Sequence, residues 1–395
     1  MRPIDEQLLE LRRGTVAIIE EAELRAKLAR GTPLRVKLGV DPTAADLHLG
    51  FTVVLRKLRQ FQDLGHQAVL IIGSYTAQVG DPSGRDSTRP MIAEADVLSN
   101  AERYLVQAGR ILDLGRLEVR HNGDWFRQMT FLDLVRLLAK TTVARTLERE
   151  DFATRYASGE AIHLHELVYP LMQGYDSVAV KADVELGGND QTFNLMVGRD
   201  LQRDAGQEPQ VCMTMPLLEG LDGVRKMSKS YGNCVGIADA PGDMFGKLMS
   251  ISDALMWKYY ELLTDVSLGG IETLKRESHP MEAKKRLAAD IVRQYHGSQT
   301  ADKARLEFER VFSGHDRPAD MPEHTLADGG AAELDVVALL TAGGLAPSKS
   351  EAKRLVTQGG VEVDGVRVGA VTCPMPQKAE FVVRAGKRRF LRVKR

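Results

Sequence analysis

The stretch Asp41-Pro42-Thr43-Ala44-Ala45-Asp46-Leu47-His48-Leu49-Gly50-Phe51 joins two segments with different hydrophobic periods. Residues 34–40 before it form an apolar run typical of a buried strand, and residues 53–62 after it show helical spacing. The stretch is therefore predicted to be a strand-to-helix loop that ends at a helix N-terminus. Free backbone N–H groups and the helix dipole favour an anion at such an end.

Three residues of this loop strengthen the anion-site interpretation. Thr43 and His48 add hydrogen-bond donors, and Gly50 lacks the Cβ that would block a close ligand. Taken alone, an ordinary βα turn with a capping Asp or Thr is the simpler interpretation. The rest of the chain decides between the two.

Strand-like and helical patterns alternate between residue 33 and about residue 215. The expected strands are 34–40, 68–73, 117–120, 183–186 and 211–215, and helical spacing is clear at 101–114, 131–138 and 192–201. This alternation predicts an α/β fold with a doubly wound, Rossmann-like parallel sheet. Ligands of such sheets bind at the carboxyl ends of the strands, which is where the opening loop lies.

The patterns divide the chain into four segments. Residues 1–222 are predicted to be the Rossmann-like catalytic domain, preceded by N-terminal amphipathic helices that include Ile18 and Ile19. Residues 223–313 hold a lysine-rich loop and a wholly helical domain, and 314–332 form a Pro- and Gly-containing linker. Residues 333–395 form a small α+β domain with a basic surface.

The last segment is basic although the whole chain has a net charge of −1. Residues 345–395 contain 12 Lys or Arg against 4 Asp or Glu, which leaves a charge of −9 on the first 344 residues. A capping box at Ser348 predicts a helix, and 361–368 predict a hairpin around Asp364-Gly365. We expect this module to bind an RNA backbone. Its candidate contacts are Lys349, Lys353, Arg354, Arg388 and Arg389.

Composition excludes several classes of protein. The 395 residues are 43% hydrophobic and 27% charged, and no apolar run approaches the length of a membrane span. Cys212, Cys234 and Cys373 lie too far apart in sequence for a paired zinc or disulfide motif. We therefore expect a cytoplasmic protein without a resident metal.

The second motif is Lys226-Met227-Ser228-Lys229-Ser230, with glycines on both sides. Two lysines on a Gly-flanked loop can close over a triphosphate and neutralise charge on a leaving pyrophosphate. Taken alone, the motif is also explained as a basic surface patch. Its position after the last expected strand places it at the same rim as the opening loop, which favours a two-sided phosphate clamp.

A third motif places Tyr169, Gln173 and Asp176 on one face of a helix. An amphipathic helix with a solvated polar face explains this pattern, but Tyr, Gln and Asp together suit an enclosed polar pocket better. Two Gly-rich turns follow expected strands, at 80–84 and at 187–191. The second can approach a sugar or base closely, whereas the first is explained by an Asp-Pro turn alone.

Together these motifs resemble the bacterial tyrosyl-tRNA synthetases of class I. The family's His-Leu-Gly-His element is present as His48-Leu49-Gly50-Phe51, and its Lys-Met-Ser-Lys-Ser loop is intact at 226–230. The basic segment resembles the small RNA-binding domain that the family shares with a ribosomal protein. The match follows the whole chain in order.

The resemblance implies an enzyme that activates tyrosine with ATP, forming tyrosyl-adenylate and pyrophosphate, and charges tRNA(Tyr). It implies ATP as a Mg²⁺ complex, no tightly bound cofactor, no editing domain and a homodimer. The phosphates would be held by Thr43, His48, Lys226 and Lys229. The rest of ATP would contact Gly50, Phe51, Gly188, Asp190 and Met227, and tyrosine would contact Asp41, Asp81, Tyr169, Gln173, Asp176 and Gln191.

Two residues depart from the family pattern. Phe51 replaces the second histidine of the family element, and Lys37 stands where many relatives have a tyrosine that contacts the substrate hydroxyl. Two alternatives stay open at this point. One is a related synthetase for another aromatic amino acid, such as tryptophan, and the other is an inactive RNA-binding paralogue.

Overall fold

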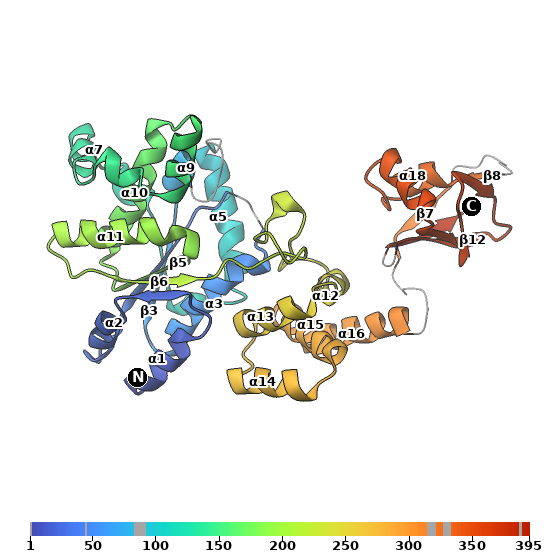
Figure 1. Cartoon of the computed structure of the whole chain (residues 1–395), viewed down its shortest axis with the longest axis horizontal. Helices are drawn as coiled ribbons and strands as arrows, with labels where there is room; N and C mark the ends of the chain where they lie inside the picture. Colours follow the sequence, from blue (N-terminus) through green and yellow to red (C-terminus); the bar gives the residue numbers. More distant parts are fainter. Residues whose placement is uncertain (1, 44–45, 83–91, 314–320, 327–332, 387–388) are drawn as a thin grey trace. The chain divides into compact units, whose positions relative to one another are not determined.

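The computed structural model describes residues 2–43, 46–82, 92–313, 321–326, 333–386 and 389–395 (Figure 1). The chain divides into two compact units, Met1–Gly297 and Ser298–Arg395. The expected turn residues Ser83 and Gly84, the predicted contact Arg388 and most of the expected linker lie outside the described residues.

The first unit is built on a six-stranded sheet of order β1-β6-β5-β2-β3-β4. Its strands are β1 (Ala17–Ile19), β2 (Arg35–Val40), β3 (Gln67–Ile72), β4 (Leu117–His121), β5 (Val184–Gly188) and β6 (Val211–Met215). Strands β2 to β6 pair in parallel, so the doubly wound prediction is confirmed. The five expected strands agree with the observed ones to within two residues at each end.

The edge strand β1 corrects one prediction. Ile18 and Ile19 were expected on a helix, but they pair antiparallel with Met213 and Cys212 of β6. This pairing joins positions nearly 200 residues apart, and local periodicity carries no signal for it.

Helices cover both faces of this sheet, and its central strands β2, β3 and β5 are therefore largely buried. Figure 1 shows α10 and α11 on one face and α1 and α3 on the other. The helices before β6 are α1 (Ile4–Arg12), α2 (Glu21–Leu28), α3 (Leu49–Asp63), α4 (Thr76–Val79), α5 (Glu94–Ala108), α6 (Gly123–Phe126), α7 (Phe131–Leu138), α8 (Val143–Thr146), α9 (Glu150–Ser158), α10 (Leu164–Val180) and α11 (Thr192–Asp204). Short 3-10 turns span Leu114–Arg116, Asn189–Gln191 and Lys229–Tyr231.

The helical region predicted after the lysine loop is confirmed. It contains α12 (Pro241–Met249), α13 (Asp253–Leu263), α14 (Leu268–Glu277), α15 (Pro280–His296) and α16 (Ser298–Ser313). Helix α15 packs against α12, α13 and α14, and its buried face includes Leu287, Ile291 and Val292. Contacts assign α16 to the second unit. Among the described residues, none of the helices is long and apolar enough to cross a membrane.

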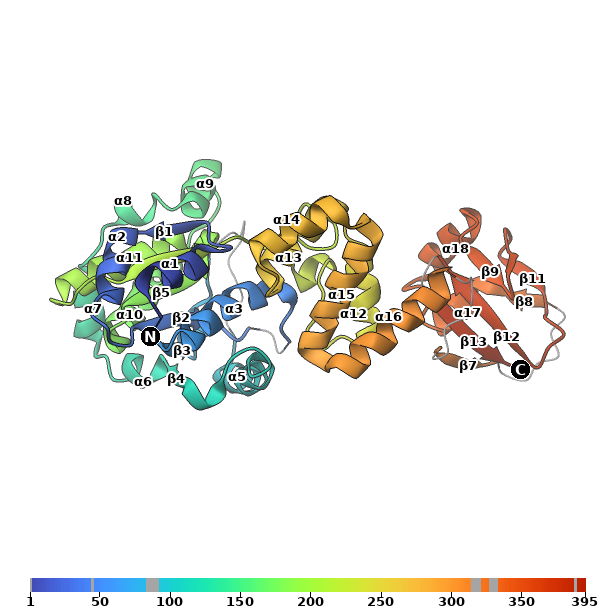
Figure 2. The same cartoon turned by 90° about the horizontal axis from the view of Figure 1, so that it is seen from below.

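The second unit contains a five-stranded sheet of order β10-β9-β12-β13-β7 and a pair β11-β8 (Figure 2). Its elements after α16 are β7 (Glu323–Thr325), β8 (Glu333–Asp335), α17 (Val336–Ala342), α18 (Lys349–Thr357), β9 (Val361–Val363), β10 (Val366–Arg367), β11 (Thr372–Pro374), β12 (Glu380–Ala385) and β13 (Arg389–Lys394). Leu340, Val356, Phe381 and Leu391 belong to one buried core that joins both helices to the sheet.

Two local predictions for this unit can be compared with the structure. The hairpin β9–β10 is confirmed, and its turn residues Asp364 and Gly365 both have positive φ, as a type I′ turn requires. Strand β7 pairs in parallel with β13 although its residues fall within the expected linker. The sheet therefore extends further toward the N-terminus than the sequence pattern indicates.

Candidate active site

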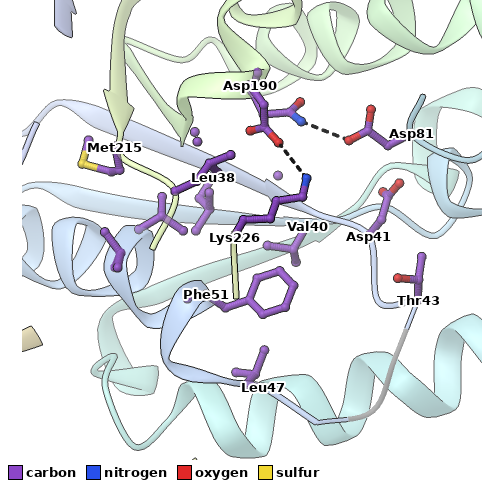
Figure 3. A pocket seen from close by; sticks show the side chains of 18 of the residues that line it. Leu38, Val40, Asp41, Thr43, Leu47, Phe51, Asp81, Asp190, Met215 and Lys226 are labelled. Atoms are coloured by element: carbon purple, nitrogen blue, oxygen red, sulfur yellow. Dashed lines mark hydrogen bonds and ion pairs between the residues drawn. The ribbon is translucent and has the colours of Figure 1, made fainter. Parts of the chain in front are cut away.

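A cavity of about 550 Å³ opens at the carboxyl ends of β2 and β5, where the order of the parallel strands reverses. Every predicted ATP or tyrosine contact except Lys229 lines it. These lining residues are Asp41, Thr43, His48, Gly50, Phe51, Asp81, Tyr169, Gln173, Asp176, Gly188, Asp190, Gln191, Lys226 and Met227. The structure thus brings together residues from five separate segments of the chain, 41–51, 81, 169–176, 188–191 and 226–227, and Figure 3 shows several of them around the cavity.

Asp176 on α10 is a buried acceptor in this cavity. Its side chain is 3% exposed, Oδ1 accepts from Nε1 of Trp125 at 3.0 Å, and Oδ2 accepts from Nδ2 of Asn122 at 3.3 Å. Burial raises the pKa of Asp176 to about 7, although the charge of Lys37 and the two hydrogen bonds act in the opposite direction. The ionised form of Asp176 is therefore populated at neutral pH and above, and it can accept a hydrogen bond from a hydroxyl group.

Tyr169, about two helical turns earlier on α10, also faces the cavity. Its hydroxyl donates to Oδ2 of Asp41 at 3.0 Å, and Oδ1 of Asp41 accepts from the Thr76 hydroxyl at 2.7 Å. A Cβ at Gly73 would lie 1.9 Å from Oδ1 of Asp41, so this position requires glycine. The pocket interpretation of the Tyr169/Gln173/Asp176 face is thereby favoured over a solvated helix face.

Lys37 lies outside the cavity lining and is fully buried. Its Nζ donates to Oε1 of Glu185 at 2.8 Å, and to the Gln173 carbonyl and the Ser177 hydroxyl at 2.9 Å each. Glu185 is itself 0% exposed. Lys37 therefore anchors α10 to the sheet on the side away from the cavity. It acts on the cavity through its charge, which opposes the rise that burial causes in the pKa of Asp176.

The helix N-terminus of the opening loop differs from the prediction. The N–H of Leu49 donates to the Val235 carbonyl at 2.9 Å, that of Gly50 to Nδ1 of His48 at 3.2 Å, and that of Phe51 to the His48 carbonyl at 2.9 Å. These three groups were expected to be free for an anion, and that expectation is wrong. The 235–237 segment pairs with the loop and His48 caps the helix, so these backbone donors are already occupied.

His48 is oriented by the same hydrogen bond. Because Nδ1 accepts from Gly50, the ring proton of neutral His48 lies on Nε2 and can be donated. Burial, with a smaller effect of the Lys229 charge, lowers the pKa of His48 to about 4. The Phe51 ring lies 4.6 Å from the His48 ring, centroid to centroid, and is 45% exposed. Phe51 thus supplies an apolar wall where the family pattern has a second histidine.

The lysine loop forms the opposite side of the cavity. Nζ of Lys226 lies 3.8 Å from Oδ2 of Asp190, as Figure 3 shows. Nζ of Lys229 pairs with Oδ2 of Asp46 at 2.8 Å. The loop backbone is held by Asn233, whose Oδ1 accepts from the N–H of Ser228 at 2.8 Å. Both lysines therefore face carboxylates at the rim of the cavity, in positions that a polyphosphate can compete for.

Sequence reasoning missed several residues that touch this set. Asn122 and Trp125 hold Asp176, and Asn194 and Arg149 contact residues of the expected tyrosine site. Asn122 directly follows β4, and a polar residue at the carboxyl end of a parallel strand is a signal that could have identified it. Local spacing carries no comparable signal for Arg149 and Asn194.

The predicted RNA contacts lie on the second unit. Lys349 and Lys353 are exposed on α18, and Arg354 on the same helix pairs with Glu351 at 2.7 Å. Arg389 donates to the Leu345 carbonyl, so part of its donor capacity is used within the unit. Three of the predicted RNA contacts, Lys349, Lys353 and Arg354, therefore lie together on α18.

A family model described as "tRNA synthetases class I (W and Y)" matches residues 29–313. The chain belongs to the class I tRNA synthetases. A second model, described as the C-terminal domain of tyrosine–tRNA ligases, matches residues 315–393. Together the two models cover nearly the whole chain of this synthetase.

The family model covers synthetases for tryptophan and for tyrosine, and full-length relatives show which of the two this chain resembles. The chain is 53% identical over 395 residues to the tyrosine–tRNA ligase of Oleidesulfovibrio alaskensis, covering 99% of both chains. It is 51% identical to that of Thermotoga maritima, covering 98% of this chain and 97% of the relative. The solved tyrosyl-tRNA synthetase of Archaeoglobus fulgidus has a TM-score of 0.64 at 22% identity, covering 77% of this chain and all of that one. This likeness confirms the fold.

Proposed function

We propose that this synthetase joins tyrosine to ATP, releasing pyrophosphate, and then transfers tyrosine from the adenylate to the 3′-terminal adenosine of tRNA(Tyr). The observation that carries the choice of amino acid is the buried Asp176, clamped by Trp125 and Asn122 inside the cavity. A phenol hydroxyl satisfies this acceptor, whereas the ring of phenylalanine leaves it unpaired. Such a site can reject the analogue by about 10⁴- to 10⁵-fold.

We propose that the tyrosine ammonium lies at the other end of the tyrosine site. Asp81, Tyr169 and Gln173 line the cavity together with Gln191 and Asp41, and these side chains offer carboxylate, hydroxyl and amide oxygens. Oxygen acceptors of this kind suit a three-donor ammonium group. The substrate is then held at both ends, which directs its carboxylate toward the nucleotide.

We propose that the two sides of the cavity hold ATP between them. Thr43 and Nε2 of His48 face Lys226 and the loop that carries Lys229, and Gly188 and Asp190 lie at the end of β5 for the ribose. The substrate carboxylate attacks the α-phosphorus, and the bond to the leaving pyrophosphate breaks. Catalysis by this arrangement is positioning plus stabilisation of charge on the phosphates.

Mg²⁺ is proposed to enter as the ATP complex, since phosphate oxygens are its preferred ligands. The tRNA is proposed to meet the exposed lysines of α18, because cations on one helix face suit a phosphate backbone. Cys212, Cys234 and Cys373 are free thiols, which supports a reducing compartment such as the cytoplasm.

We propose a homodimer in which α7 contributes to the interface. Phe131 is 82% exposed, and Leu132, Val135 and Leu138 are exposed beside it on the same short helix. Val143 of α8 adds a further exposed apolar side chain. Contiguous apolar surface of this kind marks an interaction site in a water-soluble fold.

Amino-acid-dependent ATP–pyrophosphate exchange tests the proposed function. Exchange with tyrosine, and none above background with tryptophan or phenylalanine, is the expected result. Exchange with tryptophan would assign the chain to the related enzyme. No exchange with any of the three amino acids would leave only the inactive RNA-binding alternative.

A further inference from the structure

Four polar side chains form a closed ring of contacts that includes residues of the expected ammonium site. The ring consists of Arg149, Asn194, Gln191 and Asp81. Nη1 of Arg149 donates to Oδ1 of Asn194 at 3.1 Å, and Nδ2 of Asn194 donates to Oε1 of Gln191 at 3.0 Å. Nε2 of Gln191 donates to Oδ2 of Asp81 at 3.0 Å. Nη2 of Arg149 closes the ring at 3.6 Å from Oδ1 of Asp81.

The ring extends to Gln173 on α10. Nδ2 of Asn194 donates to Oε1 of Gln173 at 2.9 Å, and Nε2 of Gln173 donates to Oε1 of Glu185 at 3.2 Å. Because an amide has distinguishable ends, these two bonds fix which end of Gln173 faces which neighbour. Asn194 therefore sets the orientation of two cavity-lining amides at once.

Arg149 and Asn194 do not themselves line the cavity in the part of the chain that the structure describes. Arg149 is 5% exposed and Asn194 is 1% exposed. Nε of Arg149 also pairs with Oδ1 of Asp151 at 2.8 Å, and this neighbouring carboxylate offsets the guanidinium charge. Arg149 can thus orient Asp81 without adding an uncompensated positive charge beside a bound ammonium.

We propose that Asn194 and Arg149 are positioning residues that preorganise Asp81, Gln173 and Gln191 for the α-ammonium of the amino acid. The inference rests on the proposed function, because it assumes that the ammonium lies among these three residues. Without the ring, the side chains must be ordered by the substrate itself, and the cost of that ordering weakens binding. Asp176 is held by Asn122 and Trp125, which are not members of the ring, so the ring acts on the ammonium end of tyrosine and not on the phenol end.

Ligand truncation separates this role from a general structural one. Dissociation constants of the full-length protein are measured by calorimetry for tyrosine and for 3-(4-hydroxyphenyl)propionate, which is tyrosine without its amino group. Asn194→Ala should weaken tyrosine binding by about 10- to 100-fold, the range for losing support of a charged hydrogen bond. Binding of the deamino analogue should change by less than about twofold, and discrimination between tyrosine and phenylalanine should stay as in the wild type.

Two further variants keep the test decisive. Asn194→Asp keeps the acceptor for Arg149 and removes the donor to both glutamines, so it should show the same selective loss if Asn194→Ala does not fold. Gln62→Ala removes a buried amide that bonds only with Asp113 among the contacts described, far from the ring in the fold, and should leave both constants unchanged.

Each remaining outcome overturns the inference. Equal weakening of tyrosine and the deamino analogue would mean that Asn194 supports the whole cavity, and unchanged tyrosine binding would mean that the ring does not position the site. If the wild-type protein neither binds tyrosine nor supports tyrosine-dependent exchange, the proposed function fails first. Failure of the proposed function can thus be told apart from failure of this inference, because it is measured on the wild-type protein alone.

Discussion

The indole Nε1 of Trp125 donates a hydrogen bond of 3.0 Å to Oδ1 of Asp176. Asp176 lines the cavity at the carboxyl ends of β2 and β5. A hydrogen bond of this kind favours the ionised carboxylate and partly opposes the effect of burial, which raises the pKa of Asp176 to about 7. The protonation state of one buried carboxyl is therefore linked to recognition of the substrate hydroxyl.

Tyrosine binding should depend on pH through Asp176. Because burial raises its pKa to about 7, the accepting carboxylate is mostly ionised at higher pH and is lost as the pH falls through that value. Between about pH 8 and about pH 6, tyrosine affinity should fall by about tenfold. Calorimetric titrations across this range measure the effect. Asp176→Asn should remove the pH dependence, and an unchanged profile in that variant would exclude Asp176 as its source.

Trp125→Phe should raise the midpoint pH at which tyrosine binding is lost. Removing a donor to the charged form costs about 1.5–3 kcal/mol, which corresponds to a pKa about 1–2 units higher. At neutral pH, tyrosine should then bind about tenfold more weakly. Trp257→Phe changes the chain's other tryptophan, on α13, and serves as the matched control. A midpoint that does not move would show that the indole hydrogen bond contributes little to the ionisation.

Lys229→Ala should lower the rate of tyrosyl-adenylate formation by about 10²- to 10³-fold, as loss of a transition-state donor does. Tyrosine affinity should stay within about twofold of the wild-type value, because Lys229 does not line the cavity and pairs with Asp46 at its rim, on the phosphate side. Rapid-quench kinetics measure the first quantity and calorimetry the second. Lys247→Ala removes a lysine paired with Asp239 and should change neither. Equal losses of rate and affinity would contradict a transition-state role.

Phe131→Glu combined with Val135→Glu should convert the proposed dimer to a monomer, since two charges in an apolar interface are costly to bury. Light scattering should give twice 43.6 kDa for the wild type and 43.6 kDa for the variant. Leu9→Glu alters an exposed leucine on α1 and should leave the mass unchanged. A wild-type protein of 43.6 kDa would refute the dimer.

Lys353→Glu should lower the kcat/KM for tRNA charging by about tenfold and make it less sensitive to salt, because a phosphate contact is replaced by repulsion. Pyrophosphate exchange should not change, since α18 lies in the other unit of the chain. Lys303→Glu on α16 carries the same charge change and should leave charging near the wild-type rate. Charging that is unaffected by Lys353→Glu would place the tRNA contact elsewhere.

The sequence by itself determined the α/β fold, the strands that carry the cavity and the residue types at its rim. Apolar runs alternate with helical spacing whatever the partners of each element are, so the five parallel strands were predictable to within two residues. Loops at the carboxyl ends of parallel strands converge at one edge, which is why Asp41, His48 and Asp190 were expected together. The face formed by Tyr169, Gln173 and Asp176 was predicted from helical period alone.

Only the tertiary structure decided how these groups are used. It showed that the first N–H groups of α3 are already bonded, that Ile18 joins an edge strand, and that Lys37 stands behind the cavity with Glu185. It also revealed the hydrogen-bond partners of Asp176 and the ring around Asn194. These contacts join residues far apart in sequence, and hydrogen bonding depends on distance and direction in space, which periodicity along the chain does not encode.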